Sequence, residues 1–556
     1  MNTGFLHFDD VHLRGENAMF QWHTPPLHRS PDAAMRCLLA CCALALSLLL
    51  SGCGLPPPQE RTTSQGLEVA ETASTPLGKG VDALRRQAGA TPDLTGFYAL
   101  LDAKEAFAAR ALMARMAQRS LDIQYYIWRG DKTGDLLAHE LILAADRGVR
   151  VRLLLDDAGT EGLDDTLLAL DSHPLIEVRL FNPFTLRWPK PLGYTTDFFR
   201  LNRRMHNKSF TADNQATIVG GRNVGNEYFG ATDGVLFADL DLLAVGAIVP
   251  AVSKDFDRYW ASTVSYPVGQ IVTRPASLSL QGLRAQGHTL LESAQARDYR
   301  DAVTQTPFIQ RLVQAQLPME WVPARLVSDD PAKALGTTQA RQLIGTQIRD
   351  ALGEPEHSLN LVSPYFIPTE EGVQAIAALR DKGVQVRVLT NSAQATDVTV
   401  VHAGYAKYRP PLLRHGVELY ELRRTAPRYV PDDERQKFAL PALGSSGSSL
   451  HAKTMAVDGK RVFVGSFNFD PRSAALNTEM GIVVDSPALA TQIEQGFATQ
   501  IPAMAYRVVL DEKEGQLRWH SGVGHPPPVY NTEPDMSLAR SLLVWLVGIL
   551  PVEWLL

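Results

Sequence analysis

The order of apolar and polar positions predicts two similar successions of helices and strands along this chain. A helical pattern at 106–118 leads into an apolar strand, and a second helical pattern ends at Gly148 before another apolar strand. The same order recurs from 340–352 to a helix that ends at Gly383. Because strands and helices alternate, the fold class expected is α/β, with one α/β/α sandwich in each half.

A polar motif accompanies a predicted strand–turn–strand in each half. The alternation of apolar residues that indicates it is seen at 216–220 and at 461–465. The motif H-x-K-x4-D occurs twice, 451 − 206 = 245 residues apart, and a glycine-rich turn that ends in asparagine follows each copy at the same distance. The residues concerned are His206, Lys208, Asp213 and Asn223 in the first half and His451, Lys453, Asp458 and Asn468 in the second.

Two imidazoles, two ammonium groups and two amides are the groups needed to split a phosphodiester. One histidine can attack phosphorus while the other protonates the leaving oxygen, and the lysines and asparagines can hold the charge on the remaining oxygens. Groups 245 residues apart form one site only if the halves meet. We therefore expect the halves to pack about a pseudo-twofold axis, with one active site at their interface.

The duplicated motif resembles the signature of the phospholipase D superfamily and, within it, the bacterial cardiolipin synthases of the type C branch. The most specific stretches are LNRRMHNKSFTADNQATIVGGRNVGNEYFG and SLHAKTMAVDGKRVFVGSFNFDPRSAALNTEMG. The resemblance implies phosphatidyl transfer through a phosphohistidine to phosphatidylglycerol, with phosphatidylethanolamine as the donor. The alternative is a phosphodiesterase, either a lipid hydrolase or a secreted nuclease, that uses water as acceptor.

The resemblance also implies a role for each site residue. His206 would be the nucleophile and His451 the general acid that becomes the general base, although the symmetric motifs do not rank them. Lys208, Lys453, Asn223 and Asn468 would bind phosphoryl oxygens, and Asp213 and Asp458 would brace the motif loops. Glu227 and Glu479 would each hold the histidine of the opposite half. No metal or other cofactor is expected, because lysine supplies the positive charge.

The four cysteines lie together near the N-terminus, at Cys37, Cys41, Cys42 and Cys53. The segment MRCLLACCALALSLLLSGCG has the layout of a secretory signal, with Met35 as the preferred initiator. Leu50 to Cys53 resembles a bacterial lipobox, which predicts acylation of Cys53; an uncleaved membrane anchor is the alternative. We expect a protein of the bacterial cell envelope, with its catalytic body on the extracytoplasmic side.

This compartment limits the reaction. Outside the cytoplasm no nucleotide triphosphate is available, so lipids are joined there by exchanging one phosphodiester for another. A net charge of −6 gives no general attraction for polyanions and weighs against nucleic acid as a partner. The partners expected are therefore phospholipid substrates and a membrane.

The domain boundaries follow from these patterns. We expect an N-terminal segment (1–53), a flexible tether (54–94), the first half (95–265), a helical connector (266–319), the second half (320–510) and a tail (511–556). The apolar end of the tail is too short to span a bilayer, and Pro551 interrupts it. It fits either a helix packed on the body or an interfacial contact.

Two further features have open interpretations. The loop at 187–204 mixes cations with aromatic side chains, which suits lipid headgroups, although an ordinary surface loop fits equally well. The acid pairs Asp156–Asp157 and Asp164–Asp165 follow a strand, and we expect them to be solvated helix caps.

Overall fold

The computed structural model describes residues 55, 63–231, 236–305, 310–311, 316–424, 448–511, 513–524, 526–548, 550 and 552–556. The signal-like segment with Met35 and Cys53 lies outside the described residues, so the predictions for it stay predictions. Among the helices that are described, none combines the length and the apolar character needed to cross a bilayer.

The first half is built on a nine-stranded sheet in the order β10-β1-β8-β6-β5-β2-β3-β4-β9. Leu153 faces α4 and α5, whereas its neighbour Leu154 packs with α9 on the other face. The elements are β1 (Thr95–Leu100), α4 (Ala103–Met116), β2 (Ser120–Ile127), α5 (Lys132–Asp146), β3 (Arg150–Gly159), α6 (Asp164–Asp171), β4 (Ile176–Phe181), α7 (Phe198–Leu201), β5 (Ser209–Ala212), β6 (Ala216–Gly220), α8 (Asn226–Phe229), β7 (Leu236–Ala238), β8 (Asp241–Gly246), α9 (Val249–Trp260), β9 (Ser265–Pro267) and β10 (Glu320–Val322).

The second half is built on a ten-stranded sheet in the order β11-β18-β17-β16-β12-β13-β14-β19-β20-β21. Helices α14 and α15 pack on one face and α19 on the other. The elements are β11 (Ala324–Ser328), α14 (Ile344–Leu352), β12 (Ser358–Val362), α15 (Thr369–Asp381), β13 (Gln385–Asn391), α16 (Thr399–Ala406), α17 (Arg409–Arg414), β14 (Glu418–Leu422), β15 (Ser448–Leu450), β16 (Lys453–Val457), β17 (Arg461–Gly465), α18 (Pro471–Ala475), β18 (Met480–Val484), α19 (Pro487–Met504), β19 (Ala505–Asp511), β20 (Gln516–Ser521) and β21 (Val529–Tyr530).

The two sheets repeat one topology. The strand order β1-β8-β6-β5-β2-β3-β4-β9 corresponds to β11-β18-β17-β16-β12-β13-β14-β19, and each pair of neighbours has the same parallel or antiparallel sense. Gly148 and Gly383, which end the second helix of each half, have φ values of 98° and 87°, a region that glycine enters without a steric penalty. The predicted fold class, with two α/β/α halves, is confirmed.

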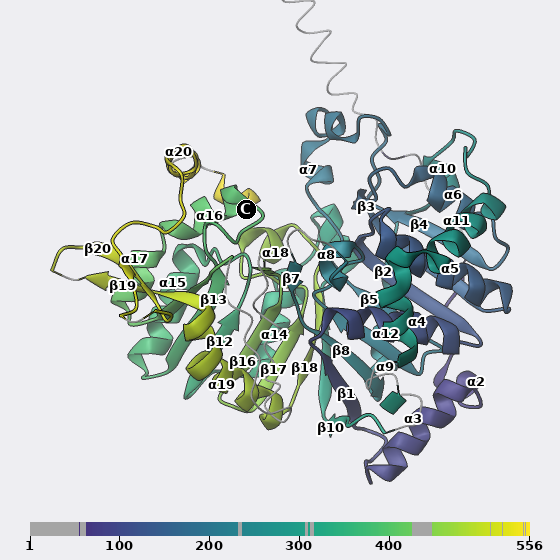
Figure 1. Cartoon of the computed structure of the whole chain (residues 1–556), viewed down its shortest axis with the longest axis horizontal. Coiled ribbons are helices and arrows are strands. Elements are labelled where there is room, and N and C mark those ends of the chain that lie inside the picture. The colour runs from purple at the N-terminus through teal and green to yellow at the C-terminus, as the bar shows by residue number, and fades with distance from the viewer. Residues whose placement is uncertain are drawn as a thin grey trace, which may run out of the picture. The chain divides into compact units, whose positions relative to one another are not determined.

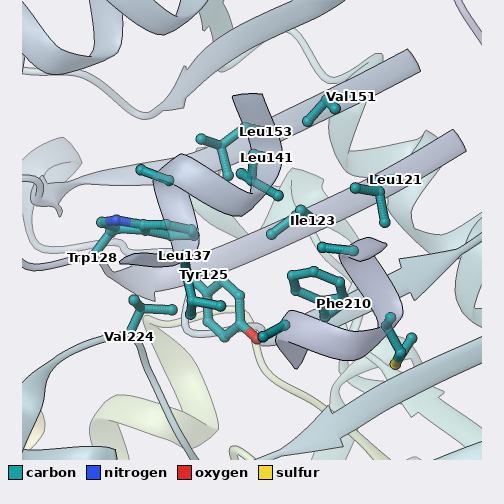
Figure 2. Packing of buried hydrophobic residues seen from close by; sticks show 14 of the residues in the cluster. Leu121, Ile123, Tyr125, Trp128, Leu137, Leu141, Val151, Leu153, Phe210 and Val224 are labelled. Atoms are coloured by element: carbon teal, nitrogen blue, oxygen red, sulfur yellow. The ribbon is translucent and has the colours of Figure 1, made fainter. Parts of the chain in front are cut away.

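Burial on both faces explains the apolar strands of each half. In the first half, Leu121 and Ile123 of β2 pack with Leu137 and Leu141 of α5 and with Phe210 of β5 (Figure 2). Each large apolar side chain that is withdrawn from water contributes about 1.5–3 kcal/mol. This packing fixes the ends of the strands from which the polar motifs project.

A shared core joins the halves. Val219 and Leu242 of the first sheet belong to the same apolar cluster as Val464 and Ile482 of the second. The two sheets therefore lie side by side with β8 close to β17 and β18 (Figure 1). This arrangement brings β5 and β16, the strands that carry the two motifs, toward one interface.

The predicted flexible tether is wrong for residues 63–94. This segment contains α2 (Val69–Thr72) and α3 (Pro76–Gln87) and lies against the first half. The backbone N–H of Gly66 donates to both carboxylate oxygens of Asp257, at 2.9 and 3.1 Å. The Asn214 amide donates to the Leu67 carbonyl at 2.6 Å. These hydrogen bonds, together with Leu77 packed in the core of the first half, hold the segment, and such hydrogen bonds leave no apolar periodicity in the sequence.

The connector is helical where it is described, as predicted. It contains α10 (Val268–Ile271), α11 (Leu280–Glu292) and α12 (Arg297–Gln305), and Leu283 and Tyr299 pack into the core of the first half. The boundary predicted at 510 is wrong, because β19 runs through it and β20 and β21 extend the second sheet. The tail ends with α20 (Leu538–Gly548) and the 3₁₀ helix η6 (Glu553–Leu555).

Candidate active site

Backbone hydrogen bonds join each histidine motif to the opposite half. The His206 N–H donates to the Thr478 carbonyl at 2.8 Å, and the Thr478 N–H donates to the Arg204 carbonyl at 2.9 Å. In the other motif, β15 pairs in parallel with β7, and the His451 N–H donates to the Ala238 carbonyl at 2.8 Å. The expectation that both motifs meet at the interface of the halves is confirmed.

The His206 ring is held by a carboxylate of the second half. Its Nδ1 lies 2.8 Å from Glu479 Oε2, and both side chains are buried. Ser473 donates to the other carboxylate oxygen at 2.8 Å, and Ser466 donates to Oε2. The Tyr126 ring packs edge-on against the imidazole with 5.0 Å between the centroids. The predicted pairing of Glu479 with the histidine of the opposite half is confirmed.

The partner of His451 is Asp239 and not Glu227. His451 Nδ1 lies 2.5 Å from Asp239 Oδ2, and this carboxylate is fully buried. The pKa of Asp239 is lowered to about 2, because His451 stabilises the carboxylate against the opposing effect of burial. Glu227 instead lies 3.4 Å from Arg129 in a partly exposed ion pair. The prediction for Glu227 is therefore wrong.

Sheet register explains this error. Gly220 pairs with Asp241 on β8, and Gly465 pairs with Gly481 on β18, so Asp239 and Glu479 each lie two residues before corresponding positions. The connection before them differs in length, because 239 − 223 = 16 residues follow Asn223 whereas 479 − 468 = 11 follow Asn468. The sequence signal was an acid just before a strand that follows each motif, whereas Glu227 lies only 227 − 223 = 4 residues after Asn223 and does not have this position.

The two lysines are buried beside their own histidines. Lys208 Nζ donates to the His206 carbonyl at 2.6 Å, and Lys453 Nζ donates to the His451 carbonyl. Burial lowers the pKa of Lys208 to about 7 and that of Lys453 to about 8, and Glu479 and Asp239 partly offset this effect. An ammonium group has three donors, so each lysine can still donate to an anion.

The two asparagines have different surroundings. The Asn223 amide oxygen accepts from the Ile127 N–H at 3.1 Å, and its amide nitrogen donates to the Tyr228 hydroxyl at 3.1 Å. The amide oxygen of Asn468 is buried and has no hydrogen-bond partner within the described part of the chain. The Asn223 amide is thus already engaged by the scaffold, and phosphoryl binding by either asparagine stays a prediction.

The two motif aspartates brace loops, as predicted. Asp213 and Asp458 have φ values of 51° and 54°, at the turn between the two strands of each motif. The Asp213 carboxylate accepts from the backbone N–H groups of residues 118–120, and Asp458 accepts from those of 356–358. Each carboxylate thereby fixes the chain that enters β2 or β12.

A further carboxylate supports the first motif. Asp156 accepts from Arg204 at 3.0 Å and from the Met205 N–H at 2.7 Å, so it holds the backbone directly before His206. Its burial raises its pKa to about 6. The neighbouring Asp157 is also fully buried. The prediction of solvated helix caps is wrong for this pair, whereas Asp164 and Asp165 do lie in the first turn of α6.

Across the described ranges, no three His, Cys, Asp or Glu side chains gather in a way that could hold a metal ion. The cations at the motifs are those of Lys208 and Lys453, which lie close enough to affect the pKa of both histidines.

Comparisons with known proteins agree with this geometry. The family described as "Cardiolipin synthase, PLD-like domain" matches residues 112–260 and 348–501. Cardiolipin synthase C of Escherichia coli K12 is 47% identical over 467 residues, which cover 84% of this chain and 97% of that protein. An uncharacterized protein of Helicobacter pylori is 33% identical over 469 residues, which cover 83% of this chain and 89% of that protein.

A solved structure shares the fold. The crystal structure of phosphatidylserine synthase from Haemophilus influenzae has a TM-score of 0.52 at 14% identity, covering 85% of this chain and 100% of that one. The chain belongs to the cardiolipin synthase family of phospholipase D-like proteins, as its duplicated motif predicts. It is an enzyme of the phospholipase D-like phosphatidyltransferase type.

The corrected histidine partner gives a direct test. Asp239→Asn should lower the turnover of a phospholipid substrate by about 10²–10⁴-fold, because His451 loses the charge that orients it. Glu227→Gln is the matched control and should change turnover less than about threefold, since a partly exposed ion pair contributes only about 0–1 kcal/mol. Thin-layer chromatography of labelled lipid products measures both variants, and the reverse ranking would contradict the assignment of Asp239.

Proposed function

We propose that this enzyme makes cardiolipin by moving a phosphatidyl group from phosphatidylethanolamine to phosphatidylglycerol. The observation that carries the proposal is the crossed pairing of His206 with Glu479 and of His451 with Asp239. It gives one interface two oriented imidazoles between two buried ammonium groups, which suits an anionic phosphodiester. The relative named cardiolipin synthase C, at 47% identity, supports the product class.

In the first step His206 attacks phosphorus. Its Nδ1 faces Glu479, so Nε2 carries the lone pair that forms the P–N bond while the P–O bond to the headgroup breaks. His451 gives its proton to the departing alcohol, and the electron pair of the broken bond stays on that oxygen. The pKa of His206 is lowered to about 4, chiefly by burial, so its imidazole is neutral and nucleophilic at neutral pH.

In the second step His451 acts as the base. It takes the proton from a hydroxyl of phosphatidylglycerol, whose oxygen then displaces His206 and forms the new phosphodiester. One P–O bond is broken and one is made, so the exchange needs no nucleotide. Lys208 and Lys453 would hold the charge on the phosphoryl oxygens in both steps, and the amide group of Asn468 would add a further donor.

The alternative acceptor is water, which would make the enzyme a phosphodiesterase. The structure holds the same groups for either acceptor. A nucleic acid substrate is disfavoured by the net charge of −6, which gives no long-range attraction for a polyanion.

A product assay distinguishes these functions. Purified enzyme with labelled phosphatidylglycerol should form cardiolipin, and added phosphatidylethanolamine should increase the yield. His206→Ala and His451→Ala should each abolish turnover, and the double variant should be no worse than either, because groups that act as one unit are not additive. Phosphatidic acid as the main product would instead indicate hydrolysis. Strong residual turnover in either single variant would rule out the two-histidine mechanism.

The buried charges also predict the pH profile of kcat/KM. The rate should fall in acid as His206 gains a proton near its pKa of about 4, and in alkali as His451 loses the proton that it must donate, because burial and Lys453 lower the pKa of this histidine. Glu479 raises the pKa of His206, so Glu479→Gln should move the acid limb to lower pH while the alkaline limb, set by His451, stays. The control Glu227→Gln should leave them in place, and circular dichroism at each pH checks folding. An acid limb that stays fixed or moves upward in Glu479→Gln would refute this assignment.

We further propose that the enzyme is a lipoprotein of the bacterial cell envelope, acylated at Cys53. The support is the signal-like segment and the lipobox-like residues before this cysteine. An acyl chain contributes roughly 0.8 kcal/mol per buried CH₂ group, so a modified Cys53 would hold the enzyme at a membrane. Mass spectrometry of the N-terminal peptide should show an acylated Cys53. An unmodified Cys53, or a chain that still begins at Met1 or Met35, would rule out this proposal and leave the catalytic one unaffected.

A further inference from the structure

Two segments that are distant in sequence leave large apolar side chains in water. In the loop before the first motif, Trp188 is 85% exposed and Phe199 is 72% exposed. On α20 of the tail, Trp545 is 61% exposed and Leu542 is 57% exposed. We call this group the apolar platform; its members are Leu186, Trp188, Leu192, Phe198, Phe199, Leu542, Leu543, Trp545, Leu546, Leu550 and Trp554.

The loop meets the end of the tail, in η6. The rings of Phe199 and Trp554 stack with 6.3 Å between their centroids and 18° between their planes. Figure 1 shows α7 and α20 along the same upper edge of the molecule, and the C-terminus lies between them. The loop and the tail thus both place exposed apolar side chains on this side of the molecule and are joined at this ring contact.

Arg472 connects this surface to the second motif. It lies in α18, the helix that follows the motif, and its Nε donates to the Leu555 carbonyl at 2.9 Å. Its Nη1 donates to the Asn202 carbonyl at 3.2 Å, four residues before His206. One side chain thus joins the tail, the loop that leads into the first motif, and α18. The end of the tail is thereby tied to the segments that lead to and follow the two motifs.

Three cations of the loop are already neutralised. Arg187 and Lys190 both pair with Asp157, and Arg187 also binds Asp164. Arg200 pairs with Asp197 in the same loop. The sequence suggested that these cations contact lipid headgroups, but these three hold the loop in place. What the loop presents to a partner is chiefly apolar and aromatic.

We propose that the apolar platform inserts into the boundary between the headgroups and acyl chains of a phospholipid bilayer. Folded proteins seldom expose a contiguous group of large apolar side chains unless a partner covers it, and tryptophan favours the membrane interface. This inference rests on the proposed function. In that function, the phosphate of the substrate lipid must reach the histidines while the acyl chains of the lipid stay in the membrane. A surface that is tied to both motif segments and penetrates the bilayer would bring the phosphate there without extracting the lipid.

The test compares two presentations of the same lipids to the full-length protein. The triple variant Trp188→Gln, Phe199→Gln, Trp545→Gln should lose at least about tenfold activity on phosphatidylethanolamine–phosphatidylglycerol vesicles. On dihexanoyl versions of both lipids below their micelle concentration it should stay within about twofold of the wild type, because no membrane is involved. The matched control is Leu143→Gln with Leu175→Gln, two apolar residues that are each 37% exposed elsewhere; it should match the wild type on both substrates.

A second measurement does not depend on catalysis. Vesicles with brominated acyl chains should quench the tryptophan fluorescence of the wild type more than that of Trp188→Phe with Trp545→Phe, and 1 M NaCl should not abolish the difference. Equal quenching, binding that salt removes, or a triple variant that keeps full activity on vesicles would each overturn the proposal. Equal losses on vesicles and on dihexanoyl lipids would do the same.

Two further outcomes are separable. If sedimentation shows a wild-type dimer that the triple variant breaks, without a change in quenching, the platform contacts a second copy and the proposal fails. If the wild type turns over neither form of the lipid, the proposed function fails, while the quenching result still decides whether the platform enters a bilayer.

Discussion

The crossed pairing of histidine and carboxylate is the interaction on which the rest of the structure depends. His206 of the first half relies on Glu479 of the second, and His451 of the second relies on Asp239 of the first. All four side chains are buried. Separating the halves would leave each carboxylate without its imidazole, and a buried charge that loses its partner costs several kcal/mol. The site therefore exists only in the assembled pair of halves.

This arrangement prepares the site for an anion before one arrives. Lys208 and Lys453 are held by the carbonyls of their own histidines, and burial lowers the pKa of both. A phosphodiester between them would supply the missing negative charge and raise those pKa values again. Because the donors already point from fixed backbone positions, little reorganisation is needed when charge develops on the phosphoryl oxygens.

The near symmetry of the motifs ends at their surroundings. Two serines clamp Glu479, whereas the Asp239 carboxylate accepts from His451 and from the Leu240 N–H. Asn223 is engaged by the scaffold, while the amide oxygen of Asn468 is unpaired among the described residues. These differences give the two imidazoles unequal environments, which a reaction with one nucleophile and one acid requires.

The sequence by itself determined whatever depends on local periodicity or on a repeated pattern. Apolar spacing predicted α4, α5, α15 and their neighbouring strands, and the turn positions of Asp213 and Asp458 followed from the duplicated motif. Only the tertiary structure identified Asp239, because the unequal connections before it and before Glu479 hide a correspondence that sheet register makes plain. Only the tertiary structure showed that 63–94 packs on the body and that Phe199 meets Trp554. A hydrogen bond or ring contact between distant segments leaves no periodic trace in a sequence, so folding alone decides it.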